Sequence, residues 1–344
     1  MKLASIRDGI HRAEDGVAGL ILLVMAAIPI LEIGLRRLFD VGIPAAIPIV
    51  QHLTLWVAFL GAALAAREDR LLALATTSFL PEGRSRAVFR AIAAAFTAAV
   101  CAALAKASYD LMVLEYEAAT EIGAGIPTWL AMVVLPVAFA IIALRQAWSA
   151  APRWSVRVVV SLAIPFGVWL TANHAVLEER SFLPWLAVIV ACTLLGAPIF
   201  AALGAAAAVL FAIEYVGPMA IPVETYSLSV SPMLPAIPLF TLTGFLLAEG
   251  RSSERLLEVF RAWFGWIPGG TAVVTVLVCA FFTAFTGGSG VTILALGGLL
   301  YPALVKEKYG EEFSIGTLTA AGSLGLLFPP ALPLILYGVV AEVP

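Results

Sequence analysis

Long apolar runs separated by short polar connections fill the first half of the chain. A hydrocarbon core about 30 Å thick requires about 20 helical residues to cross it. Runs of this kind are found at residues 16–39, 44–66, 87–112, 127–148 and 156–172. They predict five membrane-spanning helices that form a plain helical scaffold.

The pattern changes after residue 184, where glycine and proline interrupt the apolar runs, as in LLGAPIFAALG, WIPGGTAVV and LLFPPALPLILYG. These residues break helices, and irregular backbone at membrane depth is tolerated only where protein buries it or where it lines a cavity. The second half is therefore predicted to carry the functional site.

The stretch FTAFTGGSGVT, residues 282–292, interrupts one of these apolar tracts. Residues 271–285 before the glycines and 291–305 after them would each form about 22 Å of helix, which is too short to span. The two segments are predicted to form a re-entrant hairpin with both ends on one side and its tip, residues 286–290, near the midplane.

A second break is predicted where a helix over residues 313–327 runs into FPPALP. Pro329 and Pro330 remove two backbone donors, which would leave carbonyls at residues 322–325 without helical partners. Two broken helices that meet in the membrane make a place for an ion. The alternative is that the glycines serve only to let helices pack closely.

The chemistry available at the two breaks is neutral. Residues 268–305 and 313–341 contain no Asp, Glu, Lys, Arg or His, so a bound cation would be held by carbonyl and hydroxyl oxygens. This favours a monovalent cation such as sodium over a divalent metal, which normally recruits carboxylates.

Composition supports a membrane protein and excludes other classes. The chain is 62% hydrophobic and 12% charged with a mean hydropathy of +1.01, which excludes a water-soluble globule. A net charge of −3 gives no reason to expect a nucleic-acid partner. The HExxH, GxxxxGK[ST] and GxSxG motifs are absent from the sequence, so an enzyme is not predicted.

Basic residues set the predicted orientation, because Lys and Arg are retained on the cytoplasmic side. The loop around residues 67–90 and the loop around 145–157 are basic, whereas residues 115–121 are acidic. The N-terminus is therefore predicted to be cytoplasmic. Arg36 and Arg37 break the rule and are expected to reach toward lipid headgroups. The basic residues are Arg67, Arg70, Arg84, Arg86, Arg90, Arg145, Arg153 and Arg157.

Several spaced motifs resemble a known family. From residue 184 onward the sequence contains, in order, LPAIPLFTLTGFLLAEG, FTAFTGGSGVTILALGGLLYPAL and YGEEFSIGTLTAAGSLGLLFPPALPLILYG. These resemble the large membrane subunit of tripartite ATP-independent periplasmic (TRAP) transporters. Residues 12–148, with LEIGLRRLF and QHLTLWVAFLGAALAAREDRLLAL, resemble the small membrane subunit of the same family.

The resemblance implies an all-α polytopic membrane protein that fuses the two subunits. Residues 1–150 would form the four-helix small-subunit region, 151–181 a connecting helix, and 182–344 the first part of the transport domain, with a re-entrant hairpin and a broken helix. Such elevator-type carriers use two inverted repeats. One repeat is recognised here, so the remainder of the large subunit is expected on a longer gene product or another chain; the alternative is a short scaffold paralogue.

The resemblance also implies a function. It indicates secondary import of an organic acid, such as a C4-dicarboxylate, driven by sodium and delivered by a periplasmic substrate-binding protein to a multi-pass protein of the bacterial inner membrane. No cofactor besides the coupling sodium ion is expected, and the bilayer is the remaining partner. A channel and a non-transporting assembly subunit stay open as alternatives.

By motif, the implied sodium site falls on the hairpin tip and the second break. Many family members carry a serine where Gly290 and Ala331 stand here, so backbone carbonyls are expected to contribute more than hydroxyls. Thr292 and the two prolines, Pro329 and Pro330, would shape the breaks or the substrate site. The sodium-site residues are Thr286, Gly287, Gly288, Ser289, Gly322, Ser323 and Gly325.

Isolated polar residues inside the spans receive structural interpretations first. Lys106 and Asp110, one helical turn apart, are predicted to form a surface ion pair rather than a relay. Glu32 and His52 are predicted to make contacts between the two halves rather than to gate protons. Residues 251–267 predict an amphipathic helix that lies at the membrane interface, as a coupling element or a passive anchor.

Overall fold

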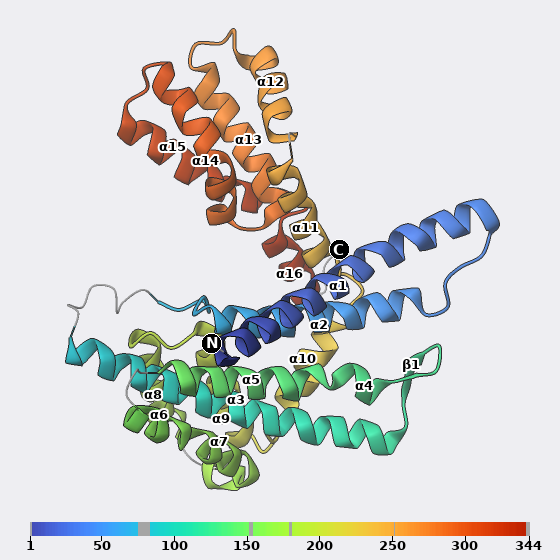
Figure 1. Cartoon of the computed structure of the whole chain (residues 1–344), viewed down its shortest axis with the longest axis vertical. Coiled ribbons are helices and arrows are strands. Elements are labelled where there is room, and N and C mark those ends of the chain that lie inside the picture. The colour runs from blue at the N-terminus through green and yellow to red at the C-terminus, as the bar shows by residue number, and fades with distance from the viewer. Residues whose placement is uncertain (1, 75–82, 151–153, 179–180, 251, 342–344) are drawn as a thin grey trace. The chain divides into compact units, whose positions relative to one another are not determined.

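The computed structural model describes residues 2–74, 83–150, 154–178, 181–250 and 252–341 (Figure 1). Nearly all of the regular structure is helical, and six helical segments are long and apolar enough to cross a membrane. Among the described residues, two short strands, β1 (Glu121–Gly123) and β2 (Ile126–Pro127), form an antiparallel pair near the predicted acidic loop. The chain is thus a helical multi-pass membrane protein.

The helices form two compact units, Met1–Val230 and Ser231–Pro344. The unit boundary lies within the region predicted as transport domain, since the helices just after residue 182 pack with the first unit. The division into residues 1–150, 151–181 and 182–344 rests on resemblance and stays a prediction.

The first unit contains all five predicted spans. The first three are single helices, whereas the fourth is divided between α4 and α5 and the fifth between α6 and α7. Its helices are α1 (Lys2–Phe39), α2 (Ala46–Arg67), α3 (Arg84–Ala118), α4 (Thr128–Met132), α5 (Val134–Ser149), α6 (Trp154–Ser161), α7 (Ala163–Ala172), α8 (Phe182–Leu194), α9 (Ile199–Ile213) and α10 (Ala220–Ser229), with a 3-10 turn at His174–Leu177.

Helix α3 lies at the centre of the first unit, where it packs mainly against α5 and α7. The approach of α7 is so close that a Cβ built on Gly167 would lie 2.1 Å from the Ala99 carbonyl oxygen. Only glycine fits there, because no side-chain atom can occupy space so near to backbone. Small residues therefore bring the predicted connecting helix into direct contact with the scaffold.

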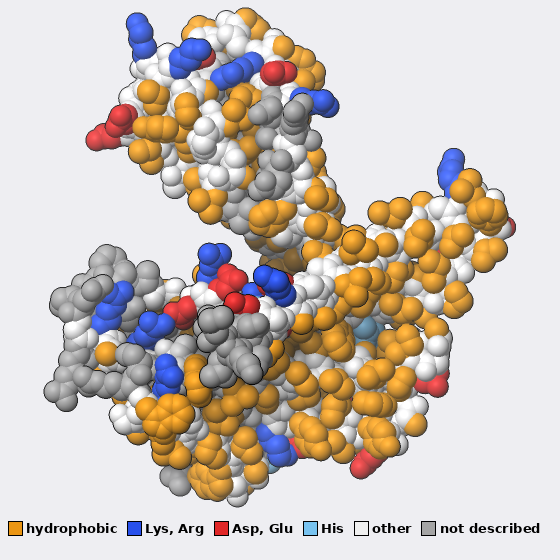
Figure 2. All heavy atoms as spheres, in the orientation of Figure 1, with side chains coloured by type: hydrophobic (Ala, Val, Ile, Leu, Met, Phe, Trp, Pro, Cys, Tyr) orange, Lys and Arg blue, Asp and Glu red, His pale blue; other side chains and the backbone are white. Residues whose placement is uncertain are grey.

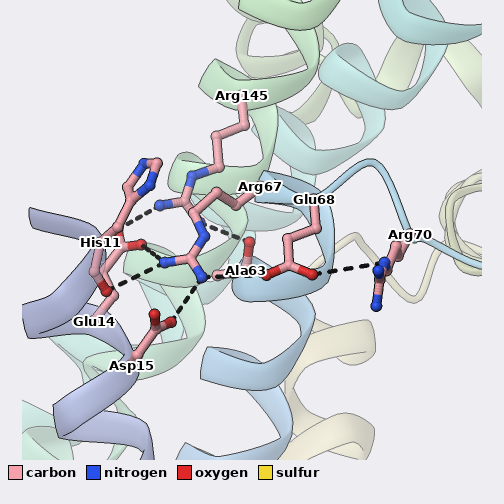
Figure 3. Close-up of polar contacts among 8 residues, drawn as sticks. All are labelled: His11, Glu14, Asp15, Ala63, Arg67, Glu68, Arg70 and Arg145. Atoms are coloured by element: carbon pink, nitrogen blue, oxygen red, sulfur yellow. Dashed lines mark hydrogen bonds and ion pairs between the residues drawn. The ribbon is translucent and has the colours of Figure 1, made fainter. Parts of the chain in front are cut away.

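Ion pairs join the ends of two helices to a third helix in the first unit (Figure 3). Arg67, at the end of α2, binds Glu14 Oε2 at 3.1 Å and Asp15 Oδ1 at 2.7 Å, both on α1. Arg145, near the end of α5, binds the other oxygen of Glu14 and the Ala63 carbonyl. The N-terminal part of α1 therefore lies at the same end of the unit as the predicted basic loops, as the predicted topology requires. Which side of the membrane is cytoplasmic stays a prediction. Arg153 lies outside the described residues.

The predicted roles of the other polar residues are partly confirmed. Lys106 Nζ lies 2.5 Å from Asp110 Oδ1, which is the expected ion pair along one helix. The prediction for Glu32 is wrong, because among the described residues its carboxylate binds Arg36 on the same helix and accepts the Ile43 N–H, both in the first half. The Glu32 side chain binds partners close to it, near the end of α1.

His52 makes the predicted contact between the two sequence halves. Its Nδ1 lies 2.7 Å from the Pro48 carbonyl oxygen, and its Nε2 lies 2.8 Å from the hydroxyl of Tyr226 on α10. Because a carbonyl can only accept, Nδ1 carries the proton. In the neutral ring Nε2 then accepts from the Tyr226 hydroxyl.

The second unit is built around α13, which packs against α11, α12, α14 and α15. Its buried core includes Val278, Phe282, Leu296, Leu300 and Leu318. The helices are α11 (Ala236–Glu249), α12 (Ser252–Phe264), α13 (Gly270–Thr286), α14 (Ser289–Lys306), α15 (Glu311–Leu324) and α16 (Leu332–Val340), with a 3-10 turn at Gly325–Leu327.

Helix α12 is the predicted amphipathic helix, and most of its apolar face packs on protein. Leu257 is buried in the core around α13, and Phe260 and Phe264 pack against that core. Trp263 of the same helix is instead exposed. Trp263 is more exposed than Phe260 and Phe264 because the core lies along only one side of α12. Elsewhere, hydrophobic side chains cover much of the outer surface, as expected for a protein surrounded by lipid (Figure 2).

Candidate functional site at the two helix breaks

The predicted hairpin is present as α13, a two-residue turn and α14. Gly287 ends α13 in the left-handed conformation, with φ of 69°, and Gly288 is extended before α14 begins at Ser289. Glycine suits the first position because a positive φ costs other residues free energy. The helical hairpin is thus confirmed, while its depth in the bilayer stays a prediction.

Three buried hydroxyl groups lie at the base of this turn. Thr283 Oγ1 lies 2.8 Å from Thr292 Oγ1, and Thr286 Oγ1 lies 2.9 Å from the same Thr292 atom. All three residues are at most 3% exposed. The hydroxyls therefore join the end of α13 to the start of α14 inside an otherwise apolar core.

The second break is also present, and it begins slightly earlier than predicted. Helix α15 ends at Leu324, a 3-10 turn follows, and Phe328 is extended before the cis Pro329–Pro330 bond and α16. The Gly325 carbonyl accepts the Phe328 N–H at 3.2 Å. The expectation that the Gly325 carbonyl has no helical partner is therefore wrong, because the 3-10 turn supplies one.

The two breaks meet within the second unit. A Cβ built on Gly325 would lie 2.4 Å from the Ala280 carbonyl oxygen, and one built on Gly322 would lie 3.3 Å from the Ser289 carbonyl oxygen. A Cβ on Gly287 would overlap the side chain of Leu332, the first residue of α16. Glycines at both breaks thus let the backbone of one approach the backbone or side chains of the other.

The structure divides the predicted site residues into two groups. Ser323 does not join the others, because it is exposed and its hydroxyl lies 3.4 Å from the Thr319 carbonyl of its own helix. Ser289 is half-buried at the tip. The residues that lie at the meeting of the breaks are Thr286, Gly287, Gly288, Ser289, Thr292, Gly322 and Gly325, with Pro329 and Pro330 in the second break.

Two further residues belong to this region and were not predicted. Thr283 is three residues before Thr286, and this helical spacing is a signal that places both on one face of α13. Gly244 on α11 lies over the tip, where its built Cβ would be 2.7 Å from Thr286 Cγ2. No local sequence pattern indicates that α11 covers the hairpin.

The arrangement suits a monovalent cation better than a metal that needs carboxylates. Helices α13 and α15 end at the breaks, and the last carbonyls of a helix carry partial negative charge. Throughout the described part of the chain, no group of three or more His, Cys, Asp or Glu side chains is placed to hold a metal ion. Neutral oxygens are therefore the available ligands at the breaks.

Two family models match the chain. Residues 25–155 match the DctQ component of the tripartite ATP-independent periplasmic transporters, and residues 186–344 match the DctM component. The first matched region contains the second part of α1 and helices α2 to α5, and the second contains both helix breaks. Because the family consists of transporter permeases, the prediction that the chain is not an enzyme is confirmed.

Individual relatives carry the same family name. The isethionate TRAP transporter permease protein DctMQ of Oleidesulfovibrio alaskensis is 34% identical over 228 residues, which are 63% of this chain and 35% of the relative. The C4-dicarboxylate TRAP transporter large permease protein DctM of Pseudomonas aeruginosa is 34% identical over 139 residues, 40% of this chain and 32% of the relative.

The ectoine TRAP transporter large permease protein TeaC of Halomonas elongata is 30% identical over 158 residues, 45% of this chain and 37% of the relative. The chain thus spans about a third of the length of these curated relatives. Matches to both components occur in order on one chain. The protein therefore belongs to the tripartite ATP-independent periplasmic transporter family, as a permease component in which DctQ-type and DctM-type regions share one polypeptide.

Proposed function

We propose that this chain is the membrane component of a sodium-coupled importer that takes organic acids from a periplasmic substrate-binding protein. It would act in the bacterial inner membrane with its N-terminus in the cytoplasm. Family membership supports a transport role, and the single observation that carries sodium coupling is the meeting of two uncharged helix breaks at Gly322 and Ser289.

Sodium coupling follows from the chemistry of the breaks. A cation between them would be stabilised by helix-end carbonyls and by hydroxyls, which are hard oxygen ligands. The hydroxyls of Thr283, Thr286 and Thr292 hold the tip backbone in place from inside the core. They would keep the carbonyls of the tip in position for an ion that binds and leaves during each cycle.

The substrate class is proposed more broadly than in the C4-dicarboxylate prediction. The relatives are named for isethionate, C4-dicarboxylate and ectoine, so the family name alone does not select one compound. Residues 268–305 and 313–341 provide no Arg or Lys to pair with a substrate carboxylate. We therefore assign much of the selectivity to the binding protein or to other parts of the transport system.

Sodium binding can be tested without knowing the substrate. The purified chain in detergent should unfold at a higher temperature in NaCl than in KCl of equal ionic strength, because a ligand that binds only the folded state stabilises it, by about 2.7 kcal/mol at 100 times its Kd. Thr292→Val keeps the side-chain shape and removes the shared hydroxyl. It should weaken the sodium response by about fivefold in apparent affinity, which corresponds to the ~1 kcal/mol typical of an intramolecular hydrogen bond.

Thr319→Val is the matched control, since Thr319 is exposed and its hydroxyl donates to the Ile315 carbonyl of its own helix. The control should respond to sodium like the unmodified protein. Equal unfolding temperatures in sodium and potassium for the unmodified chain would refute a sodium site at the breaks.

Uptake into vesicles by the complete transport system tests the function itself. A panel of organic acids, each with the binding protein and an inward sodium gradient, should identify a saturable substrate. Gly288→Val should abolish this uptake by filling the tip, while valine tolerates the extended backbone at φ of −141°. Flux without the binding protein would favour a channel, and assembly without any flux would favour a scaffold subunit.

A further inference from the structure

An apolar cavity of about 190 Å³ lies inside the first unit and includes none of the proposed sodium-site residues. Its walls come from α3, α7, α8 and α9 and from the 3-10 turn after α7. Among the described residues that line it, those with polar side-chain atoms are Thr171, His174 and Trp185. The Thr171 hydroxyl already donates to the Gly167 carbonyl at 3.1 Å. The cavity therefore offers a polar solute few partners.

The cavity lies along candidate membrane spans and reaches the outer surface. Its α3 residues, 96–104, are in the middle of the candidate span 85–118, and its α7 residues, 166–171, belong to the candidate span 154–172. Phe166 on α7 and Val188 on α8 both line the cavity and are about half exposed. The cavity is therefore open beside these two side chains, on a surface where lipid is the surrounding solvent.

His174 lies at one end of the cavity. Gly167 lies against Ala99, and Thr171 Oγ1 lies 3.4 Å from the Ala103 carbonyl oxygen, so α7 runs parallel to α3. His174 follows the last turn of α7. It is therefore at the end of the cavity that lies toward the C-terminus of α3.

Trp185 lies at the same end as His174. Cys192 on α8 shares a buried cluster with Ala93 of α3, whereas Ile189, nearly one turn earlier on α8, shares one with Val100, so α8 runs antiparallel to α3. Trp185 is about one further turn toward the start of α8. The cavity thus has an imidazole and an indole at one end and apolar side chains elsewhere. This pattern fits an amphiphile whose chain lies deeper than its polar part.

Hydrocarbon is the occupant that these properties favour. An apolar cavity of about 150 Å³ stays dry and takes up apolar molecules, so water would not fill this one. An empty cavity forfeits dispersion contacts along its walls. Lipid chains are as apolar as the lining and surround the opening. A lipid chain can therefore fill the cavity without giving up a polar contact.

We propose that one acyl chain of a bilayer phospholipid occupies this cavity and enters it beside Phe166 and Val188. The chain would pack between α3, in the DctQ-matched region, and α9, in the DctM-matched region. It would also contact α7, which lies between the two matched regions. The inference does not depend on sodium coupling or on organic-acid transport.

Photo-crosslinking in vesicles tests the site. A phosphatidylethanolamine with a diazirine near the end of one acyl chain is reconstituted with the protein and irradiated, and peptide mass spectrometry locates the labelled residues. Lipids on the outer surface label exposed residues such as Leu203 on α9. Ala205 and Val209 on the same helix are buried and line the cavity, so a chain inside the cavity is required to label them. We expect label at both of these residues.

Ala208→Phe fills the cavity from α9, because Ala208 is a lining residue. It should lower the labelling of Ala205 and Val209 by about tenfold, the effect of withdrawing about two methylene groups from an apolar site, and leave the labelling of Leu203 unchanged. Ala207→Phe is the matched control, since Ala207 is the preceding residue of α9 and does not line the cavity. It should label like the unmodified protein.

Thermal unfolding identifies variants that retain the fold. If Ala208→Phe does not fold, Ala103→Leu fills the cavity from α3 and should reduce the labelling in the same way. Absence of label at Ala205 and Val209 in the unmodified protein would overturn the proposal, and so would label that persists in a folded cavity-filling variant. Labelling of these residues by a diazirine alkane but not by the phospholipid would also overturn it, because the cavity would then take a different apolar ligand.

Discussion

The two units of the molecule stabilise their helices in different ways. Among the residues that the structure describes, side-chain ion pairs occur in the first unit, as at Arg67, Glu14 and Arg145, and not in the second. The second unit is held by an apolar core around α13 and by buried hydroxyls at Thr283, Thr286 and Thr292. Charged pairs suit helix ends near water, whereas inside hydrocarbon a charged side chain is costly and polar groups are satisfied by neutral partners.

Close backbone approach occurs in both units but has different consequences. Gly167 brings α7 against the Ala99 carbonyl of the long helix α3 in the first unit. Gly325 brings a 3-10 turn against the Ala280 carbonyl of α13 in the second unit. The first contact joins helices, and the second joins a helix to an interrupted backbone. The same use of glycine therefore produces a scaffold in one unit and a candidate ion site in the other.

The largest expected effect on stability comes from adding a side-chain atom at the close contact between Gly325 and the Ala280 carbonyl in the second unit. Gly325→Ala would place a Cβ 2.4 Å from the Ala280 carbonyl oxygen, so backbone must move. We expect a loss of about 3 kcal/mol of stability, at the upper end for overpacking, and a loss of the sodium-dependent rise in unfolding temperature. Gly316→Ala on α15 is the control, because its built Cβ meets nothing within 4 Å. A normal sodium response in Gly325→Ala would show that this contact is not part of the proposed sodium site.

A smaller effect is expected from neutralising the shared carboxylate of the first unit. Glu14→Gln weakens the contacts of α1 with Arg67 and Arg145, which are only partly exposed. The expected loss is about 1–2 kcal/mol, between the values for surface and buried pairs. Thermal unfolding in detergent measures it, and the sodium response should persist. Arg70→Gln, which removes a largely exposed pair with Glu68, should cost less than about 0.5 kcal/mol. Equal losses of stability from the two substitutions would show that the ion pairs of Glu14 stabilise the first unit no more than an exposed pair does.

The smallest effect concerns the contact between the two family regions within the first unit. Tyr226→Phe removes the hydroxyl that binds His52 Nε2 and should cost about 1 kcal/mol of stability. Tyr109→Phe is the control, because Tyr109 is 51% exposed on α3. The double variant His52→Phe, Tyr226→Phe should cost less than the sum of the single changes, since both remove one interaction. Strict additivity would show that the hydrogen bond contributes nothing to the contact.

Local pattern was sufficient to predict the five spans of the first half and the two helix breaks of the second. The apolar runs indicated the five spans of the first unit, and glycine and proline indicated the turn at Gly287 and the break before α16. These features depend on neighbouring residues, because helix length and backbone freedom are local properties. The unit boundary at Val230 could not be predicted in this way, since the packing of α8 to α10 with α3 depends on residues far apart in sequence.

By itself, the sequence determined which residue types are available at the breaks: glycines, prolines, hydroxyls and no charges. Only the tertiary structure decided which of them meet. Gly322 and Gly325 lie on one side of their helical turn and face the hairpin, whereas Ser323, about 100° around the helix from Gly322, faces away. The physical reason is that helical periodicity determines which residues share a face, but packing against α13 and α14 selects the face that is buried.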